Sequence, residues 1–314
     1  MRTKVLVTGA DGLLGSACVA LLMEEGAEVV ALVRDRDPRS PFYRRGLVDG
    51  CIEVRSELAN AGRLLSEYQP QTILHLAAQT QVPVASADPL STWESNLRGT
   101  WLLLEACRKS AQPPRSIVVA SSDKAYGTGT LPYTEDSPLA AITPYDVSKA
   151  ATDMIARSYG THFALPVVIT RCGNLYGPGD LNEARLVPGV CMALARGEAP
   201  QLRSTGEMTR EWLHVDDAAR ATLLLAERAA THAGVAFNVG GGERATAKEV
   251  ARMLIELSGR PTQVQASLED PQGEIPHQAL DSSRLQALGW EARIPLAKGL
   301  AESWAWYEEL GRSA

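Results

Sequence analysis

Short apolar runs alternate with amphipathic, helix-like segments through the first half of the chain. The runs that predict strands are residues 4–8, 27–33, 51–54, 72–76, 116–120 and 165–170. The segments between them that predict helices include residues 13–25, 93–109 and 145–161. Continuous apolar strands separated by helices are typical of a parallel sheet that helices cover on both faces. We therefore predict an α/β fold with a doubly wound parallel sheet.

The pattern changes after Arg171. Gly, Pro and Asn cluster at residues 173–179, and the later elements are shorter and less regular. We expect helices at residues 186–196, 216–227, 246–257 and 296–307, and a strand at 236–239. This change predicts a larger domain over residues 1–172, with segments near 211–239 returning to it, and a smaller domain over residues 173–314.

Composition narrows the class of protein further. The 314 residues are 45% hydrophobic and 22% charged, with 26 Gly and 18 Pro, which excludes collagen-like, disordered and disulfide-rich classes. The net charge of −6 lacks the basic footprint of a nucleic-acid binder. The five cysteines are far apart without a CxxC pair, which indicates reduced thiols rather than a metal site.

No part of the sequence indicates a membrane or an export route. No apolar run approaches the ~18 residues that a membrane span needs. The N-terminus enters a strand almost at once, so we expect no cleaved signal peptide. We therefore expect a cytoplasmic protein without a membrane partner.

Three glycines, Gly9, Gly12 and Gly15, join the first strand to the first helix at a GxxGxxG spacing. Glycines there permit a tight turn and close approach of the backbone to a pyrophosphate, which the helix N-terminus attracts. Turn geometry alone is the other explanation. The position directly between a strand and a helix favours nucleotide binding.

The end of the second strand bears on which dinucleotide binds. An acidic residue there binds the ribose 2′-hydroxyl of NAD, whereas an arginine accommodates the 2′-phosphate of NADP. The chain has Arg34 first and Asp35 next, which favours NADP over NAD. The alternative is that Arg34 and Arg36 are solvated loop charges.

Tyr145 and Lys149 form a YxxxK pair on a predicted helix, where residues four apart share a face. A neighbouring ammonium and the charge of a cofactor would lower the pKa of the tyrosine towards neutrality and make it a usable acid or base.

With these motifs in order, the whole chain resembles the extended short-chain dehydrogenase/reductase superfamily, in its nucleotide-sugar epimerase/dehydratase branch. Besides the glycine turn and the YxxxK pair, the segments that carry the resemblance are residues 75–79 (HLAAQ), 96–100 (NLRGT), 121–122 (SS), 171–179 (RCGNLYGPG), Arg210 with 212–217 (WLHVDD), and 288–290 (LGW). The resemblance implies a Rossmann domain over residues 1–172 that binds NAD(P), and a smaller domain over 173–314 that holds a nucleoside diphosphate hexose.

The resemblance also implies the site residues. Those expected at the cofactor are Gly9, Asp11, Gly12, Leu13, Leu14, Gly15, Arg34, Asp35, Glu57, Leu58, Leu76, Ala77, Ala78, Gln79, Asn96, Ser121, Tyr145, Lys149 and Cys172. Those expected at the substrate are Gln79, Ser122, Asp123, Lys124, Tyr145, Asn174, Asn182, Arg185, Leu186, Val187 and Arg210. Glu57 departs from the family, which usually has aspartate beside the adenine, so that contact is left open.

Ser122-Asp123-Lys124 separates two reactions within the branch. A 4,6-dehydratase needs an acid and a base for water loss, and the Asp-Lys pair is similar to that of CDP-glucose 4,6-dehydratases. The catalytic set is then Ser122, Asp123, Lys124, Tyr145 and Lys149, with Asp123 as acid and Lys124 as base or relay. A 4-epimerase needs neither, and a catalytically silent dinucleotide sensor is a more remote alternative. The family also implies a homodimer in which the helices near residues 91–109 and 145–161 form a four-helix bundle with their mates.

Overall fold

A computed structural model of the chain describes residues 3–269 and 277–312. Its centre is a seven-stranded parallel sheet in the order β10-β6-β5-β4-β1-β2-β3. The strands are β1 (Lys4–Thr8), β2 (Glu28–Val33), β3 (Ile52–Arg55), β4 (Thr72–His75), β5 (Ser116–Ser122), β6 (Val167–Cys172) and β10 (Ala236–Val239). The predicted doubly wound parallel sheet is confirmed, and the order is that of a Rossmann fold with one added strand.

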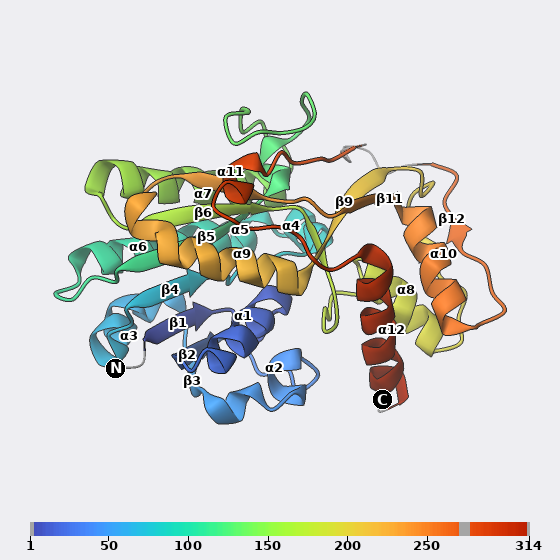
Figure 1. Ribbon diagram of the computed structural model, residues 1–314, viewed down its shortest axis with the longest axis horizontal. Coiled ribbons are helices and arrows are strands. Elements are labelled where there is room, and N and C mark those ends of the chain that lie inside the picture. The colour runs from blue at the N-terminus through green and yellow to red at the C-terminus, as the bar shows by residue number, and fades with distance from the viewer. Residues whose placement is uncertain (1–2, 270–276, 313–314) are drawn as a thin grey trace.

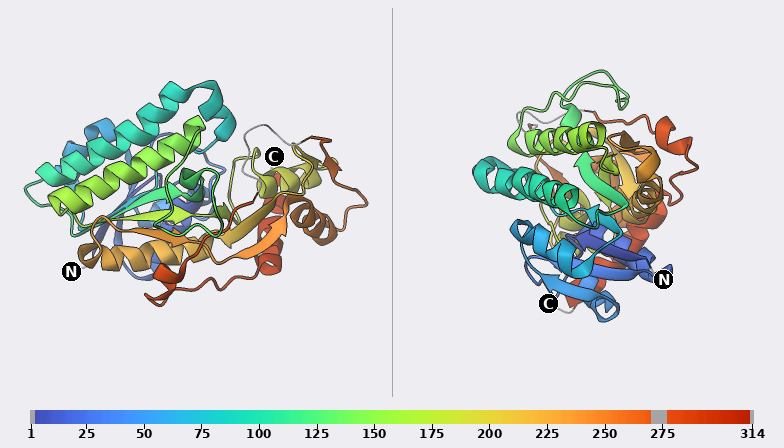
Figure 2. Two further views of the ribbon diagram at one scale, coloured as in Figure 1. Left: turned by 90° about the horizontal axis from the view of Figure 1, so that it is seen from above. Right: turned by 90° about the vertical axis from the view of Figure 1, so that its left-hand side faces the viewer.

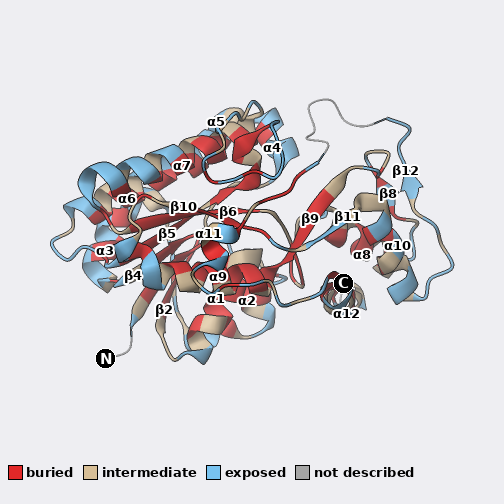
Figure 3. Ribbon diagram, turned by 45° about the horizontal axis from the view of Figure 1, so that its top comes forward, coloured by how far each residue is buried: buried red, intermediate tan, exposed pale blue. Residues whose placement is uncertain are grey.

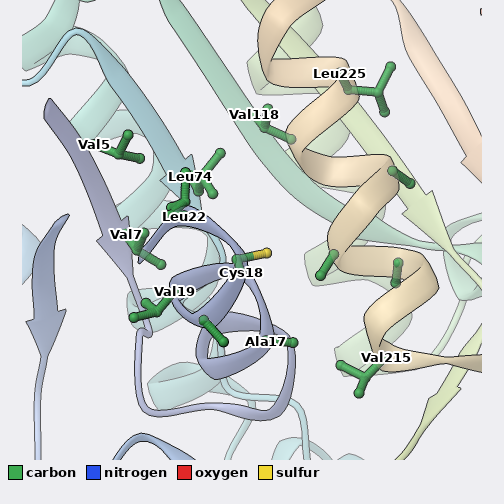
Figure 4. Packing of buried hydrophobic residues seen from close by; sticks show 14 of the residues in the cluster. Val5, Val7, Ala17, Cys18, Val19, Leu22, Leu74, Val118, Val215 and Leu225 are labelled. Carbon is green, nitrogen blue, oxygen red and sulfur yellow. The ribbon is translucent and has the colours of Figure 1, made fainter. Parts of the chain in front are cut away.

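Helices cover both faces of this sheet (Figure 1). Side chains alternate along each strand, so Val5 and Val7 of β1 belong to the core on the face that α1 (Leu13–Glu24) and α9 (Val215–Arg228) cover (Figure 4). Leu6 points to the opposite face, where the helices are α3 (Ala61–Tyr68), α6 (Gly99–Lys109) and α7 (Pro144–Phe163). Burial from both sides explains why the inner strands are mostly apolar.

A second lobe lies at one end of the sheet and has its own core. Buried residues of α8 (Leu186–Ala195), α10 (Ala247–Ser258) and α12 (Leu296–Arg312) pack together there. Two small sheets, β11-β9-β7 and β12-β8, belong to this region. Their strands are β7 (Asn174–Tyr176), β8 (Gln201–Leu202), β9 (Thr209–His214), β11 (Glu243–Thr246) and β12 (Gln265–Ala266). Although α9 and β10 follow β9 in the chain, they return to the large sheet, and the domain boundary at residue 172 stays a prediction.

Short helices connect these elements. They are α2 (Pro41–Arg44), η1 (Leu47–Gly50), η2 (Leu58–Asn60), α4 (Val82–Ala87), α5 (Pro89–Trp93), η3 (Glu94–Arg98), η4 (Asp123–Tyr126), η5 (Ala229–Thr231) and α11 (Ser283–Gln286). The η3 segment is a π-helical turn that joins α5 to α6. Figure 2 shows α6 and α7 side by side on the outside of the sheet, away from the second lobe.

Burial follows the layers. Except for the edge strand β3, the strands of the large sheet are almost wholly buried, whereas the outer faces of the helices are exposed (Figure 3). All five cysteines are free thiols, and four of them are buried. Within the part of the chain that the structure describes, every helix is too short or too polar to cross a membrane.

Candidate active site

A cleft of about 1790 Å³ runs across the carboxyl ends of the central strands and into the second lobe. This is where open parallel sheets bind ligands, at the point where the strand order reverses. The volume exceeds the ~300–1,000 Å³ that suits one drug-sized ligand, so it is large enough for two. Every site residue expected from the sequence lines this cleft except Asn96.

The glycine turn leaves a hollow, the glycine cradle, that side chains at Gly9 and Gly15 would fill. Gly9 has a φ of 67°, and a Cβ on it would lie 2.8 Å from the Cα of Ala77. A Cβ on Gly15 would collide with the carbonyl oxygen of Gly9. Gly12 caps α1 in an extended conformation, so the first-turn N–H groups of the helix face the cleft. These features fit the pyrophosphate of a dinucleotide.

A buried hydrogen-bond chain ties this turn to the end of β4. The Thr8 hydroxyl accepts from the backbone nitrogens of Leu76 and Ala77, both at 3.2 Å, and lies 2.9 Å from His75 Nδ1. Because both lone pairs of the Thr8 hydroxyl are used, its hydrogen is donated to Nδ1. The proton of the neutral His75 ring is therefore on Nε2, which lies 3.0 Å from the Thr100 hydroxyl. Burial lowers the pKa of His75 to about 3, so the ring stays neutral and the hydrogen bonds keep one donor–acceptor arrangement.

Asn96 lies behind the cleft rather than on it. Its Nδ2 donates to the carbonyl oxygen of Gln79 at 3.0 Å and to the Ser148 hydroxyl at 2.9 Å. Its Oδ1 accepts from the backbone nitrogen of Gln79 at 2.7 Å. The amide is therefore occupied by the protein, and it holds the loop after β4 against α7.

Ser122, Asp123 and Lys124 form a tight turn where β5 ends and η4 begins. The Ser122 hydroxyl donates to Asp123 Oδ1 at 3.0 Å and accepts from the backbone nitrogen of Lys124 at 3.2 Å. Ser122 and Asp123 are buried, whereas Lys124 is partly exposed along the cleft. The turn thus places a hydroxyl, a carboxyl and an amine in consecutive positions.

Tyr145 and Lys149 enter the same place from the first turns of α7. Thr143 caps this helix, and Pro144 occupies its first position, which fixes where the helix begins. Lys149 Nζ donates to the carbonyl oxygen of Ala120 at 3.0 Å, and burial lowers its pKa to about 8. Burial raises the pKa of Tyr145 to about 12, against the opposing charge of Arg185. Without a cofactor, desolvation outweighs the nearby positive charge; the expected fall of this pKa included the charge of a cofactor and stays a prediction.

The second lobe supplies the other wall. Arg185 Nη1 donates to Asp180 Oδ2 at 3.0 Å, and Asp180 Oδ1 accepts from the backbone nitrogen of Asn182 at 3.0 Å. Asn174 on β7 and Arg210 on β9 also face the cleft. Positive and amide side chains in this arrangement suit the diphosphate and hydroxyl groups of a nucleotide sugar.

The far end of the cleft lies beyond the second strand. Arg34 Nε pairs with Asp35 Oδ2 at 2.7 Å, and both side chains are exposed. Ser40 is only 2% exposed and lines the cleft, and its hydroxyl has no hydrogen-bond partner among residues 3–269 and 277–312. A buried hydroxyl without a partner is a group that a ligand can satisfy.

Sequence reasoning missed three residues at the site: Ser40, Asp146 and Gln278. Asp146 follows Tyr145 directly, lines the cleft and is buried, so its place inside the YxxxK motif was a usable signal. Burial raises the pKa of its carboxyl, and the Lys124 charge opposes this rise. Ser40 and Gln278 lie outside every motif and reach the site only through the fold.

Comparison with known proteins agrees with this geometry. Residues 5–240 match the NAD dependent epimerase/dehydratase family. A dTDP-glucose 4,6-dehydratase of Streptomyces griseus is 35% identical over 321 residues, which cover 98% of this chain and 95% of that protein. A crystal structure of a dTDP-glucose 4,6-dehydratase from Streptomyces venezuelae with NAD bound is 30% identical and has a TM-score of 0.88, covering 98% of this chain and 97% of that one.

An epimerase is structurally as similar. The UDP-glucose 4-epimerase of Thermotoga maritima, crystallised with UDP-glucose, has a TM-score of 0.89 at 26% identity, with 98% of this chain and 99% of that one covered. The likeness spans both lobes in each case. The glycine cradle, the Ser122 turn and the Tyr145–Lys149 pair therefore stand in a chain that belongs to the NAD-dependent epimerase/dehydratase family.

Proposed function

We propose that this chain is a nucleoside diphosphate sugar 4,6-dehydratase, which converts a nucleotide hexose into its 4-keto-6-deoxy derivative. The observation that carries the proposal is the turn at Ser122, which sets Asp123 and Lys124 beside Tyr145 in one cleft. Water loss needs an acid and a base beyond the pair used for oxidation at C4. The similarity to curated 4,6-dehydratases over nearly the whole chain supports the same reaction.

The cradle at Gly9 and Gly15 would hold the pyrophosphate of NAD(P), and Lys149 would lie at its ribose. When bound, NAD(P) would supply the acceptor for hydride from C4 of the sugar and the donor of hydride to C6. Tyr145 would accept the proton of the C4 hydroxyl, with the Ser122 hydroxyl holding the sugar oxygen. Because burial, with the charges of Asp123 and Asp146, raises the pKa of Tyr145, its activation would depend on the positive charges that meet it in the complete site.

Asp123 and Lys124 would then carry out the elimination. Oxidation at C4 makes the C5 proton acidic, and Lys124 in its neutral form would remove it. A protonated Asp123 would give its proton to the C6 hydroxyl, which departs as water and leaves a C5–C6 double bond. Hydride would add at C6, and Lys124 would return its proton to C5. The proton that Tyr145 took from the C4 hydroxyl replaces the one that Asp123 gave to water; passed through the Ser122 hydroxyl, which donates to Asp123, it would restore both groups.

Mass spectrometry after incubation with a panel of nucleoside diphosphate hexoses tests the proposal. A product lighter by one water supports the dehydratase. A product of unchanged mass and new retention time makes the enzyme an epimerase, and no product with any sugar makes it a silent dinucleotide-binding protein. Tyr145→Phe is the matched control, because it should prevent both reactions.

We also propose that NADP is preferred over NAD. Arg34 lies at the end of β2, where an arginine suits the 2′-phosphate, and the unsatisfied hydroxyl of Ser40 lines the same end of the cleft. Asp35 competes for the Arg34 guanidinium, so a 2′-phosphate would have to displace this pair.

A homodimer is the assembly that we propose. Trp93 and Trp101 are eight positions apart on the continuous helix formed by α5, η3 and α6, and they are 41% and 40% exposed. Met154, on the neighbouring α7, is 61% exposed. Large apolar side chains on two adjacent helices form a face suited to a four-helix bundle with a second copy.

A further inference from the structure

Gln278 comes from a segment far from every catalytic motif, yet its side chain reaches Lys124. Its amide oxygen Oε1 lies 3.4 Å from Lys124 Nζ and 3.3 Å from Asn174 Nδ2. Gln278 is only 2% exposed. One buried oxygen therefore accepts from a side chain of the catalytic turn and from a side chain of the second lobe.

The backbone that follows Gln278 is held by hydrogen bonds to two other segments. The nitrogen of Tyr133 donates to the carbonyl oxygen of Ala279 at 2.9 Å, and the nitrogen of Asp281 donates to the carbonyl oxygen of Tyr133 at 2.9 Å. The nitrogen of Leu280 donates to the buried carboxylate of Glu211 at 2.9 Å. These bonds fix the backbone next to Gln278, so its side-chain amide has a fixed position relative to Lys124.

The orientation of the amide follows from its neighbours. Lys124 and Asn174 both present donors, so a reversed amide would place its NH₂ group against an ammonium and a second NH₂. With Oε1 towards them, Nε2 is buried without a partner among the described residues. A buried donor left unsatisfied is costly, so stability alone would favour an apolar side chain here. The acceptor oxygen therefore explains why glutamine, rather than an apolar residue, stands at this position.

We propose that Gln278 is a positioning residue for water loss, acting through Lys124, whose amine it holds beside Asp123 and Asn174. The inference rests on the proposed dehydratase function. The charged group that also interacts with Lys124 is Asp146 on α7, and Asp123 is the neighbour of Lys124 in the turn. Gln278 adds a neutral acceptor from a third direction, which restrains the amine without a further full charge.

Two substitutions separate this role from a structural one. Gln278→Met keeps the length and removes the acceptor, whereas Gln278→Glu keeps an acceptor and adds a negative charge. Brief labelling with acetic anhydride acylates neutral, accessible amines. The rate of labelling at Lys124, measured by mass spectrometry with Lys109 as internal reference, therefore reports how accessible and neutral its amine is. We expect roughly threefold faster labelling in Gln278→Met and roughly threefold slower labelling in Gln278→Glu. Gln112→Glu, in an exposed loop, is the charge-matched control and should leave the rate unchanged.

A purely structural role predicts faster labelling in both variants, because both would loosen the packing around Lys124, and that result would overturn the inference. Equal labelling in all variants would overturn it as well. This measurement needs no substrate, so it decides whether Gln278 restrains the Lys124 amine even if the wild type dehydrates no sugar and the proposed function fails.

Kinetics supply the second test. In single turnovers, Gln278→Met should leave C4 oxidation within about twofold of the wild type and slow water loss roughly tenfold. In a Lys124→Met background the same substitution should add nothing, because the group it positions is gone. Equal slowing of both steps, or additive losses, would contradict the positioning role.

Discussion

His75 gives a prediction whose size follows from the structure. Its ring is buried and neutral between Thr8 and Thr100, and burial lowers its pKa from an ordinary value of 6.5 to about 3. The unfolded chain therefore binds one more proton than the folded chain between these values, so acidification destabilises the fold. Each pH unit below 6.5 costs about 1.4 kcal/mol, which amounts to about 2 kcal/mol at pH 5. That is a large part of the ~5–15 kcal/mol that stabilises an ordinary protein.

Urea unfolding at several pH values between 5 and 7 measures this effect. His214, whose pKa burial also lowers, contributes a loss of the same sign in every variant. His75→Gln should therefore be less stable at pH 7 and should lose about 2 kcal/mol less than the wild type on going to pH 5. The exposed His162→Gln is the control and should keep the wild-type pH dependence.

The same pH dependence in His75→Gln and in the wild type would refute the reasoning. If His75→Gln does not fold, the NMR signals of His75 in the wild type decide the matter. They should stay constant from pH 7 to pH 5, and a titration in that range would contradict a neutral buried ring.

Three further predictions concern the site and the assembly. Asp123→Asn should still oxidise C4 and accumulate reduced nicotinamide, seen by its near-ultraviolet absorbance, while its rate of water loss falls roughly 10²–10⁴-fold. Tyr145→Phe should lose both steps. Wild-type turnover in Asp123→Asn would show that Asp123 has only a structural role. Calorimetric titration should show NADP binding more tightly than NAD, and Arg34→Ala should lose at least about tenfold of that preference; equal affinities in the wild type would contradict it. Light scattering at micromolar concentration should give a dimer for the wild type and a monomer for Trp101→Glu, and a monomeric wild type would count against the interface.

The apolar strands were predictable because burial on both faces leaves a plain signal. Residues 4–8 form β1 as expected, and the predicted strand at 236–239 is β10. Strand ends were harder to place. The expected strand at 116–120 continues to Ser122, because the Ser121 hydroxyl donates to the carbonyl oxygen of Lys149 and so satisfies a polar group inside the sheet.

The second lobe shows why local pattern has limits. The strand β9 carries Arg210 and Glu211, which are buried polar residues that an apolar search passes over. Glu211 is tolerated there because its carboxylate accepts from the backbone nitrogens of Gly241 and Leu280. These partners lie far along the chain, so only the folded structure brings them to the strand.

The site residues likewise divide into those that local motifs predict and those that only the fold brings together. Motif spacing predicted the glycine cradle and the YxxxK pair, and the family resemblance predicted the Ser122 turn, because each is a local arrangement within one element or turn. Asn96 belongs to a motif, but its amide is used by Gln79 and Ser148, and no spacing reveals that. Gln278 carries no motif at all, and its contact with Lys124 spans 154 positions of sequence.

The fate of the hydrogen at C4 tests the central claim most directly. A nucleotide hexose that carries deuterium at C4, chosen from the panel as an accepted substrate, would be incubated with the enzyme and its product read by NMR. A dehydratase of the proposed kind moves that deuterium to C6, so the product should carry it in the new methyl group beside a C4 ketone. Deuterium returned to C4, with the C6 hydroxyl still in place, would contradict the account and show an epimerase.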